Sequence, residues 1–157
     1  EAMRFWGLKA ALPLAPGGMI GHEVARLSAL YLGFTGGTLV LLNAPAGIAS
    51  EFAPLPAGAT IITKQSSQAD LLVLFCNDTA ALKKSLSAVA KKLPAEGSLW
   101  VSWPKKSSKL FVDLTEDIIR EVVLPTGLVD VKVCAVNADW SGLKLMVRKE
   151  RRAGWNR

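Results

Sequence analysis

The residues of this sequence best suited to chemistry stand at the end of an apolar run, in the stretch LWVSWPKKSS at positions 99–108. Pro104 ends the apolar run, and two lysines and two serines follow it. Lysine ammonium groups hold phosphate or carboxylate groups as point charges, and serine hydroxyls add hydrogen bonds. The stretch lacks the glycine spacing of a phosphate-binding loop. Two interpretations stay open: an anion site that uses Lys105, Lys106 and Ser107, or a solvated loop after a strand.

Other residue types that carry catalysis are sparse. The single histidine, His22, has no Cys, Asp or second His near it, so we expect no zinc site and no nucleophile–histidine–acid combination. Cys76 and Cys134 lie in apolar runs that should raise their thiol pKa, which argues against a cysteine nucleophile. Helix capping and the helix dipole account for the acids of DLTEDIIREVVL at 113–124. The sequence therefore predicts no catalytic residue and no metal site.

Tryptophan supplies a further candidate for ligand binding. Trp140 stands in NADWSG, which the pattern places at a hairpin tip, where its ring could stack on a ligand or a base, or fold back over the edge of the sheet. Trp100 and Trp103 fall on opposite faces of one predicted strand, so they cannot line one pocket together and we expect them in the core.

The elements that must position these residues alternate between strand and helix patterns. Continuous apolar runs at 38–45, 59–64, 70–76 and 98–103 predict strands covered on both faces, as in a parallel sheet. Apolar residues at helical spacing predict helices over 24–33, 79–93 and 113–124, the second capped by Asp78 or Thr79 and the third by Asp113 in a capping box. The strands expected at 129–137 and 142–149 close the chain as an antiparallel hairpin. This order predicts an α/β fold with an open, doubly wound, mostly parallel sheet and a C-terminal antiparallel hairpin.

Length and composition indicate a single domain with an apolar extension at its N-terminal side and a basic extension at its C-terminal side. Half of the 157 residues are hydrophobic, and 19 basic residues against 13 acidic ones give a net charge of +6. Residues 1–23 form an irregular apolar arm, 24–150 the domain, and 151–157 a basic tail. No apolar run reaches the roughly 20 residues that span a bilayer. Two cysteines in apolar runs favour a soluble protein of a reducing compartment, the cytoplasm or an organelle matrix.

Two stretches carry a resemblance to known proteins. LPAEGSLWVSW, which leads from a predicted helix into the apolar strand at 98–103, resembles the corresponding step of the Rossmann-like class I methyltransferase fold, and the terminal hairpin also fits that fold. LNAPAGI, LWVSWPKKSS and the segment from 113 to 150 also resemble an uncharacterised family of small bacterial proteins, a domain of unknown function. The resemblance covers roughly residues 25–150 and implies a Rossmann-like fold without an assigned activity.

The methyltransferase resemblance also implies where a cofactor would lie, in the turn LLNAPAGIASEF after the first strand. Class I methyltransferases carry glycines and an acidic residue there, whereas this chain has Asn43 at the acidic position and Pro45 among the expected glycines, with only Gly47 remaining. From this departure we expect no cofactor. In the alternative, S-adenosylmethionine or a nucleotide contacts Asn43, Ala44 and Gly47. The remaining contacts of that alternative come from Lys105, Lys106, Ser107 and Trp140.

Three functions remain open at this stage. The first is a non-catalytic binding or structural module, an accessory subunit that contacts protein partners through the apolar arm and the basic tail. The second is a small transferase that binds S-adenosylmethionine, a nucleotide or another anionic ligand at the carboxyl edge of the sheet. The third is an RNA-binding accessory protein that uses the lysines at 83, 84, 91 and 92 together with the tail. The first is the function that the sequence favours.

Overall fold

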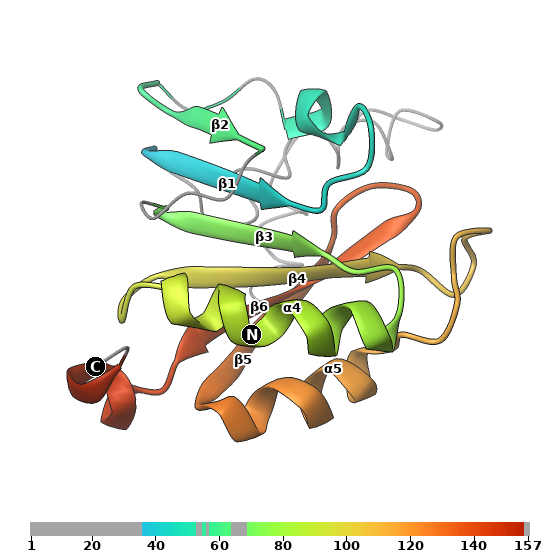
Figure 1. Ribbon diagram of the computed structural model, residues 1–157. Coiled ribbons are helices and arrows are strands. Elements are labelled where there is room, and N and C mark those ends of the chain that lie inside the picture. Colours follow the sequence, from blue (N-terminus) through green and yellow to red (C-terminus); the bar gives the residue numbers. More distant parts are fainter. Residues whose placement is uncertain (1–35, 53–54, 56, 64–68, 156–157) are drawn as a thin grey trace, which may run out of the picture.

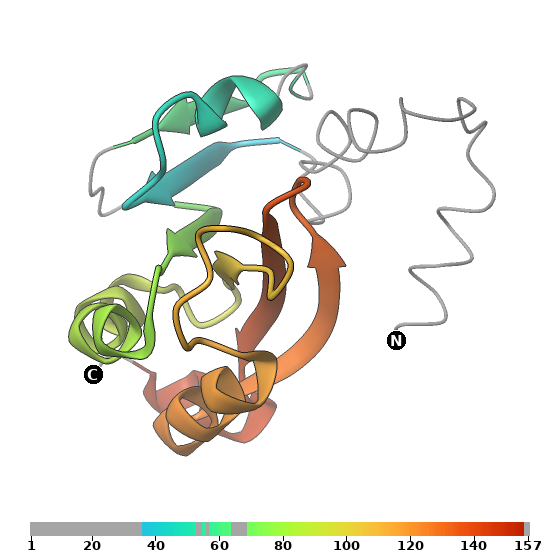
Figure 2. The same cartoon turned by 90° about the vertical axis from the view of Figure 1, so that its right-hand side faces the viewer.

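The computed structural model describes residues 36–52, 55, 57–63 and 69–155. They form a six-stranded sheet with both α-helices on one face (Figure 1 and, turned by 90°, Figure 2). The predicted arm at 1–23 and the helix predicted at 24–33 lie outside the described residues. The strands are β1 (Thr38–Leu42), β2 (Thr60–Ile62), β3 (Leu71–Phe75), β4 (Ser98–Pro104), β5 (Leu128–Ala135) and β6 (Trp140–Val147). The helices are α4 (Thr79–Lys92), α5 (Glu116–Val123) and the 3-10 helices η2 (Ile48–Phe52), η3 (Leu124–Thr126) and η4 (Lys149–Gly154).

The strand order is β2-β1-β3-β4-β6-β5. The pairs β1–β2, β1–β3 and β3–β4 are parallel, and β6 pairs antiparallel with both β4 and β5. This arrangement confirms the predicted fold class. Its physical basis is the continuous apolar pattern of the inner strands, since every residue of β3 is buried and a strand without a polar face must be covered on both sides.

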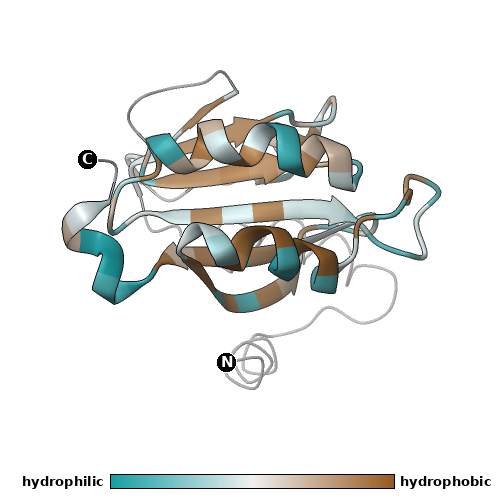
Figure 3. Ribbon diagram, turned by 60° about the horizontal axis from the view of Figure 1, so that its bottom comes forward, coloured by the Kyte–Doolittle hydropathy of each residue, from teal (hydrophilic) through white to brown (hydrophobic). Residues whose placement is uncertain are grey.

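The sheet separates two apolar layers. The layer on the helix side contains Leu82 and Leu86 of α4, Ile119 of α5, and Trp103 of β4. The layer on the opposite face contains Phe52, Trp100 and Trp140. Trp100 and Trp103 therefore occupy opposite faces of β4, as the alternation of strand side chains predicts. In Figure 3, β3 is hydrophobic along its length, β4 alternates between hydrophobic and less hydrophobic residues, and α4 and α5 each carry both hydrophobic and hydrophilic residues.

The two α-helices begin differently from each other. Asp78 is the N-cap of α4, and its side chain accepts a 2.7 Å hydrogen bond from the N–H of Ala81, which confirms the predicted cap. The capping box predicted at Asp113 is wrong, because Thr115 is the N-cap of α5. Asp113 instead accepts a 2.9 Å hydrogen bond from the backbone N–H of Thr79. The Asp113 carboxylate, just before α5, thus accepts from a backbone N–H in the first turn of α4 that has no partner within its own helix. Local sequence spacing does not reveal such a contact.

Part of the predicted basic tail is folded against the domain. Residues 149–154 form η4, and Trp155 after it packs against the apolar layer on the helix side. The indole N–H of Trp155 donates a 2.9 Å hydrogen bond to the carbonyl oxygen of Leu93 at the end of α4. This bond satisfies one of the carbonyl groups that a helix leaves free at its C-terminus. The division of the chain into an arm, a domain and a tail stays a prediction.

Candidate functional site

The topology selects one place on the sheet for a ligand. The chain passes from β1 to β2 on one side and then returns to β3 on the other side of β1. In open α/β sheets such a reversal leaves a crevice outside the carboxyl ends of the two strands, and ligands bind there. A depression of about 360 Å³ lies at this point, and we call it the switch-point site. It is lined by Leu42, Asn43, Thr63, Leu74, Lys84, Ser85, Ala88 and Val89.

The lining of the switch-point site combines apolar walls with a few polar groups. Leu42 and Leu74 are register partners at the carboxyl ends of β1 and β3 and form its base. Thr63 follows β2, while α4 contributes the Ser85 hydroxyl and the Lys84 ammonium group. Such a lining suits a ligand with an apolar ring, hydrogen-bonding groups and one anionic group.

The turn after β1 borders this site. Asn43 has φ 56°, in the left-handed region that asparagine tolerates better than most residues, and it lines the depression. Gly47 has φ 80°, and a Cβ built on it meets no atom within 4 Å, so its backbone faces open space. Within the described segments, no acceptor pairs with the N–H groups of Ala46 and Gly47. Ala44, in contrast, packs against the apolar layer of Phe52 and Trp100.

The lysines after β4 lie in a different depression. It has a volume of about 340 Å³ and is lined by Trp103, Lys105, Lys106, Thr115, Glu116, Asp117 and Ser141. Two carboxylates, of Glu116 and Asp117, therefore share this depression with the two lysines and offset part of their positive charge. Ser107 is exposed and does not line it. The anion site predicted from Lys105, Lys106 and Ser107 stays a prediction, and the structure does not unite it with Asn43 in one pocket.

The loop that carries these lysines is held in place and exposes apolar side chains. The Lys105 N–H donates to the Asp139 carbonyl oxygen at 2.7 Å, and the Ser108 hydroxyl donates to the Asp139 carboxylate at 3.0 Å. Leu110 and Val112 further along are 50% and 61% exposed. They are the exposed large hydrophobic residues of the described part of the chain. A loop anchored to the hairpin yet apolar at its surface is a candidate contact region.

Trp140 lies in the core and not at a hairpin tip. Its side chain is 4% exposed, and its ring meets Phe75 edge to face with centroids 5.2 Å apart. The turn before β6 is closed by the side chain of Asn137, whose oxygen accepts hydrogen bonds from the N–H groups of Asp139 and Trp140. Of the two interpretations of Trp140, the structure matches the ring folded back onto the sheet.

The two cysteines are poor nucleophiles. Burial, with a smaller contribution from the nearby Asp78 carboxylate, raises the pKa of the Cys76 thiol to about 12. Burial also raises the pKa of the Cys134 thiol to about 12, against a smaller opposing effect of Lys132. Both thiols are therefore protonated at neutral pH. Among the residues that the structure describes, no three His, Cys, Asp or Glu side chains gather as metal ligands would.

Sequence reasoning found Asn43 but missed most of the switch-point site. Thr63 and Ser85 were not predicted as ligand contacts, and Lys84 was predicted only as an RNA contact, although all three line the depression together with Asn43. Helical periodicity places 84, 85 and 88 near one another on α4, but it does not say which strand ends that part of the helix meets. The only available signal was the reversal of strand order, which depends on the pairing of β1 with both β2 and β3.

The chain belongs to a family described as "Protein of unknown function (DUF3052)", whose profile matches residues 57–149, more than half of its length. Residues 1–55 match a second profile, described as the 4TM region of the DNA translocase FtsK/SpoIIIE. No helix among the described residues has the length and apolarity that a membrane crossing requires. Curated protein sequences provide no match.

Several solved structures with a similar fold are methyltransferases. Magnesium protoporphyrin IX methyltransferase (ChlM) from Synechocystis PCC 6803, with bound SAM, matches with a TM-score of 0.54 and 11% identity over 93% of this chain and 91% of its own. The mitomycin 7-O-methyltransferase MmcR matches with a TM-score of 0.61 and 12% identity over 92% of this chain and 60% of its own. A SAM dependent methyltransferase from Aquifex aeolicus matches with a TM-score of 0.56 and 10% identity over 94% of this chain and 99% of its own. At these identities the likeness shows the fold alone.

These comparisons contradict our expectation that the domain takes no cofactor. A protein of the same fold holds SAM, and another is named for its dependence on it. The expectation depended on a stiff turn poor in amide donors. The turn does contain Pro45, but the N–H groups of Ala46 and Gly47 keep no acceptor within the described segments, and Gly47 leaves open space beside it. The absence of the usual glycines therefore does not remove the donors that a cofactor needs.

Proposed function

We propose that this domain binds S-adenosylmethionine, or a closely related adenosine compound, at the switch-point site. The observation that carries the proposal is the depression outside the carboxyl ends of β1 and β3, where the chain reverses direction across the sheet. Its volume of about 360 Å³ falls within the roughly 300–1,000 Å³ of small-molecule sites. The fold that the chain shares with SAM-dependent methyltransferases supports the choice of ligand.

The residues present fit such a ligand by their chemistry. Leu42, Leu74 and Val89 offer apolar contact to a purine ring. The Thr63 and Ser85 hydroxyls suit the ribose hydroxyls and ring nitrogens. The carboxylate of the methionine portion has a partner in the Lys84 ammonium group. The N–H groups of Ala46 and Gly47 in the bordering turn, which have no acceptor within the described segments, are further donors for it.

Beyond binding, we propose that the domain is a small transferase. S-adenosylmethionine supplies an electrophilic methyl group when bound. The chain's own contribution is to hold the cofactor and to bring an acceptor beside it, since positioning alone supplies a large part of the rate of a two-substrate reaction. Neither buried thiol takes part, because both are protonated at neutral pH.

The test is calorimetric titration and thermal unfolding with S-adenosylmethionine, S-adenosylhomocysteine and ATP. We expect saturable binding of the first two and a rise in Tm, because a ligand at about 100 times its Kd stabilises the folded state by about 2.7 kcal/mol. Ala88→Trp fills the switch-point site from α4 and should abolish both effects. Ala80→Trp adds the same side chain at another exposed position of α4 and should leave them intact. No binding at millimolar ligand by a folded wild-type protein would refute the proposal.

A second candidate is the accessory role, and the exposed Leu110 and Val112 favour it. The loop between β4 and α5 is held to the hairpin through Asp139, so these two side chains stay in water although the loop has a defined shape. Affinity purification from native lysate, read by mass spectrometry, tests this role. A partner that is retained by the wild type and by Ala57→Ser but lost by Leu110→Ser/Val112→Ser supports it. A partner retained equally by all three proteins contradicts it.

A further inference from the structure

The helix α4 and the 3-10 helix η4 bring basic side chains together from distant parts of the chain. In Figure 1, η4 lies near the C-terminal end of α4, and the hydrogen bond from Trp155 to Leu93 joins the two elements. Helix α4 contains no acidic residue, and Glu150 is the acid within η4. The ion pairs of the described residues all involve Arg120 of α5, so these cations have no carboxylate partner there. Lys84 lines the switch-point site. The other basic residues of α4 and of the segment 148–152 make up what we call the α4–η4 surface: Lys83, Lys91, Lys92, Arg148, Lys149, Arg151 and Arg152.

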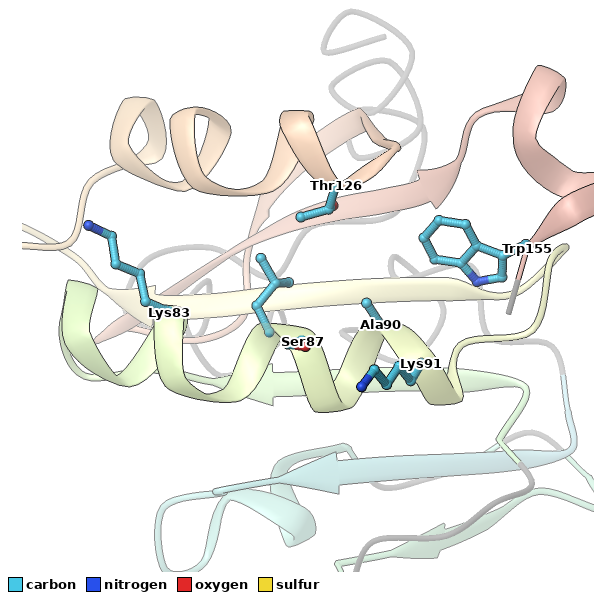
Figure 4. Close-up of a pocket in the computed structure, with 7 residues that line it drawn as sticks. Lys83, Ser87, Ala90, Lys91, Thr126 and Trp155 are labelled. Carbon is cyan, nitrogen blue, oxygen red and sulfur yellow. The ribbon is translucent and has the colours of Figure 1, made fainter. Parts of the chain in front are cut away.

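A groove runs along this surface, between α4 and the end of α5 (Figure 4). Its volume is about 410 Å³. Lys83 lies at one end of the groove and the indole ring of Trp155 at the other, on the side opposite α4. The full lining is Lys83, Leu86, Ser87, Ala90, Lys91, Thr126 and Trp155. An aromatic ring inside an otherwise basic and apolar groove offers both stacking and charge.

Trp155 is held in the groove by its surroundings. Its N–H donates to the Leu93 carbonyl, and part of its ring packs on the helix-side core while the residue stays half-buried. Gly127 provides room for it, since a Cβ at this position would lie 3.3 Å from Cζ3 of Trp155 and 2.9 Å from Cδ of Arg151. A ring fixed in this way presents a stacking surface at little further cost in entropy.

We propose that the α4–η4 surface binds single-stranded nucleic acid, with a base stacked on Trp155 and backbone phosphates held by Lys83 and Lys91. Stacking on an aromatic side chain and cations along a groove are the two elements of sequence-tolerant single-strand binding. The inference goes beyond the cofactor site and does not depend on it, because Lys83, Lys91 and Trp155 do not line the switch-point site.

The features of the groove favour this partner over other anionic ones. An anionic membrane would require apolar side chains that project from the surface, whereas Trp155 is seated inside the groove. An acidic protein segment would use the lysines but has no need of the ring. A duplex keeps its bases stacked on one another and cannot offer one to Trp155. Glu121 of α5 is an exposed acid five residues before Thr126, but it does not line the groove.

The test is fluorescence anisotropy with labelled oligothymidylate and oligouridylate of about 12 nucleotides, within the range of site sizes of roughly 4–16. We expect saturable binding whose affinity falls with salt, with a slope of roughly −0.7 per phosphate neutralised. Lys83→Glu/Lys91→Glu should lower the affinity more than tenfold and flatten the slope. Lys109→Glu/Lys132→Glu makes the same change in net charge at positions that do not line the groove and should have little effect. A preference between the two oligonucleotides identifies DNA or RNA as the partner.

The role of the ring is tested separately. Trp155→Phe should keep most of the affinity, and Trp155→Leu should lose roughly tenfold, as alanine substitution of a stacking ring does; circular dichroism verifies that both are folded. Equal losses from the two charge-reversal pairs would overturn the proposal, as would a duplex bound as tightly as the single strand. Tighter binding to vesicles of phosphatidylglycerol and phosphatidylcholine than to either oligonucleotide would assign the surface to a membrane and overturn it too.

Discussion

Gly127→Ala is the substitution that most directly tests how the C-terminal segment is seated on the domain. Gly127 follows η3 with φ 101° and ψ 4°, and its N–H donates to the Leu124 carbonyl at 3.3 Å. A left-handed backbone conformation destabilises a residue that has a Cβ by roughly 1–2 kcal/mol relative to glycine. The added Cβ would also lie 2.9 Å from Cδ of Arg151 and 3.3 Å from Cζ3 of Trp155. Both contacts are with η4 or the residue directly after it.

The two costs differ in how far they can be relieved. The backbone cost is unavoidable, whereas the Arg151 side chain is flexible and can move away from the new methyl group. We therefore expect the free energy of unfolding to fall by about 1–3 kcal/mol. At this chain length 1 kcal/mol corresponds to roughly 4 °C, so Tm should fall by roughly 4–12 °C.

Urea unfolding followed by tryptophan fluorescence measures the change. Gly154→Ala is the matched control, because a Cβ there meets no atom within 4 Å, and its stability should stay close to that of the wild type. Gly127→Asn should recover part of the backbone cost but not the contact with Arg151. In an Arg151→Ala background Gly127→Ala should cost less, as a double-mutant cycle would show. If Gly127→Ala and Gly154→Ala are equally stable, the seating of η4 on this turn is refuted.

Two further predictions follow from the buried thiols and from the cap of α4. The pKa values of the Cys76 and Cys134 thiols are raised to about 12 in the folded protein. The unfolded chain releases these thiol protons above roughly pH 8.5, whereas the folded protein keeps them. The free energy of unfolding should therefore be highest below that pH and fall as the pH rises above it. Urea unfolding at about pH 8 and about pH 10 should show this loss, and a loss that persists in Cys76→Ala/Cys134→Ala would contradict the cause. Asp78→Ala removes the N-cap and should cost about 1 kcal/mol of stability. Asp117→Ala is its control, since that carboxylate is 93% exposed, and equal losses in the two variants would contradict the capping role.

Local patterns in the sequence account for most of the fold. The apolar runs at 38–45 and 70–76 contain β1 and β3, and the apolar spacing over 79–93 contains α4. These predictions succeed because a strand covered on both faces and a helix covered on one leave different periods in the chain. The start of α5 was misplaced because Asp113 meets the first turn of α4, a contact between residues 34 positions apart. The helix-capping propensity of Asp113 does not depend on the first turn of α4, so it could not predict this contact.

The candidate site was predictable in only one part. Asn43 could be expected at a strand end, but Thr63 and Ser85 reach it only after β2 and β3 pair on either side of β1. Trp140 could be expected at the hairpin, yet its burial against Phe75 depends on hydrogen bonds to Asn137 and on the packing of the hairpin over the sheet. Side-chain type alone does not separate a stacking ring from a core ring.

By itself, the sequence determined where strands and helices form, which faces of them are apolar, and that the chain is basic. Tertiary structure alone decided that α4 borders the switch-point site on one side and a groove closed by Trp155 on the other, with Trp155 bonded to a carbonyl 62 positions away. The physical reason is the range of the forces involved. Backbone preferences and periodic apolarity act over a few residues, whereas a pocket exists only where surfaces from distant segments are buried against one another.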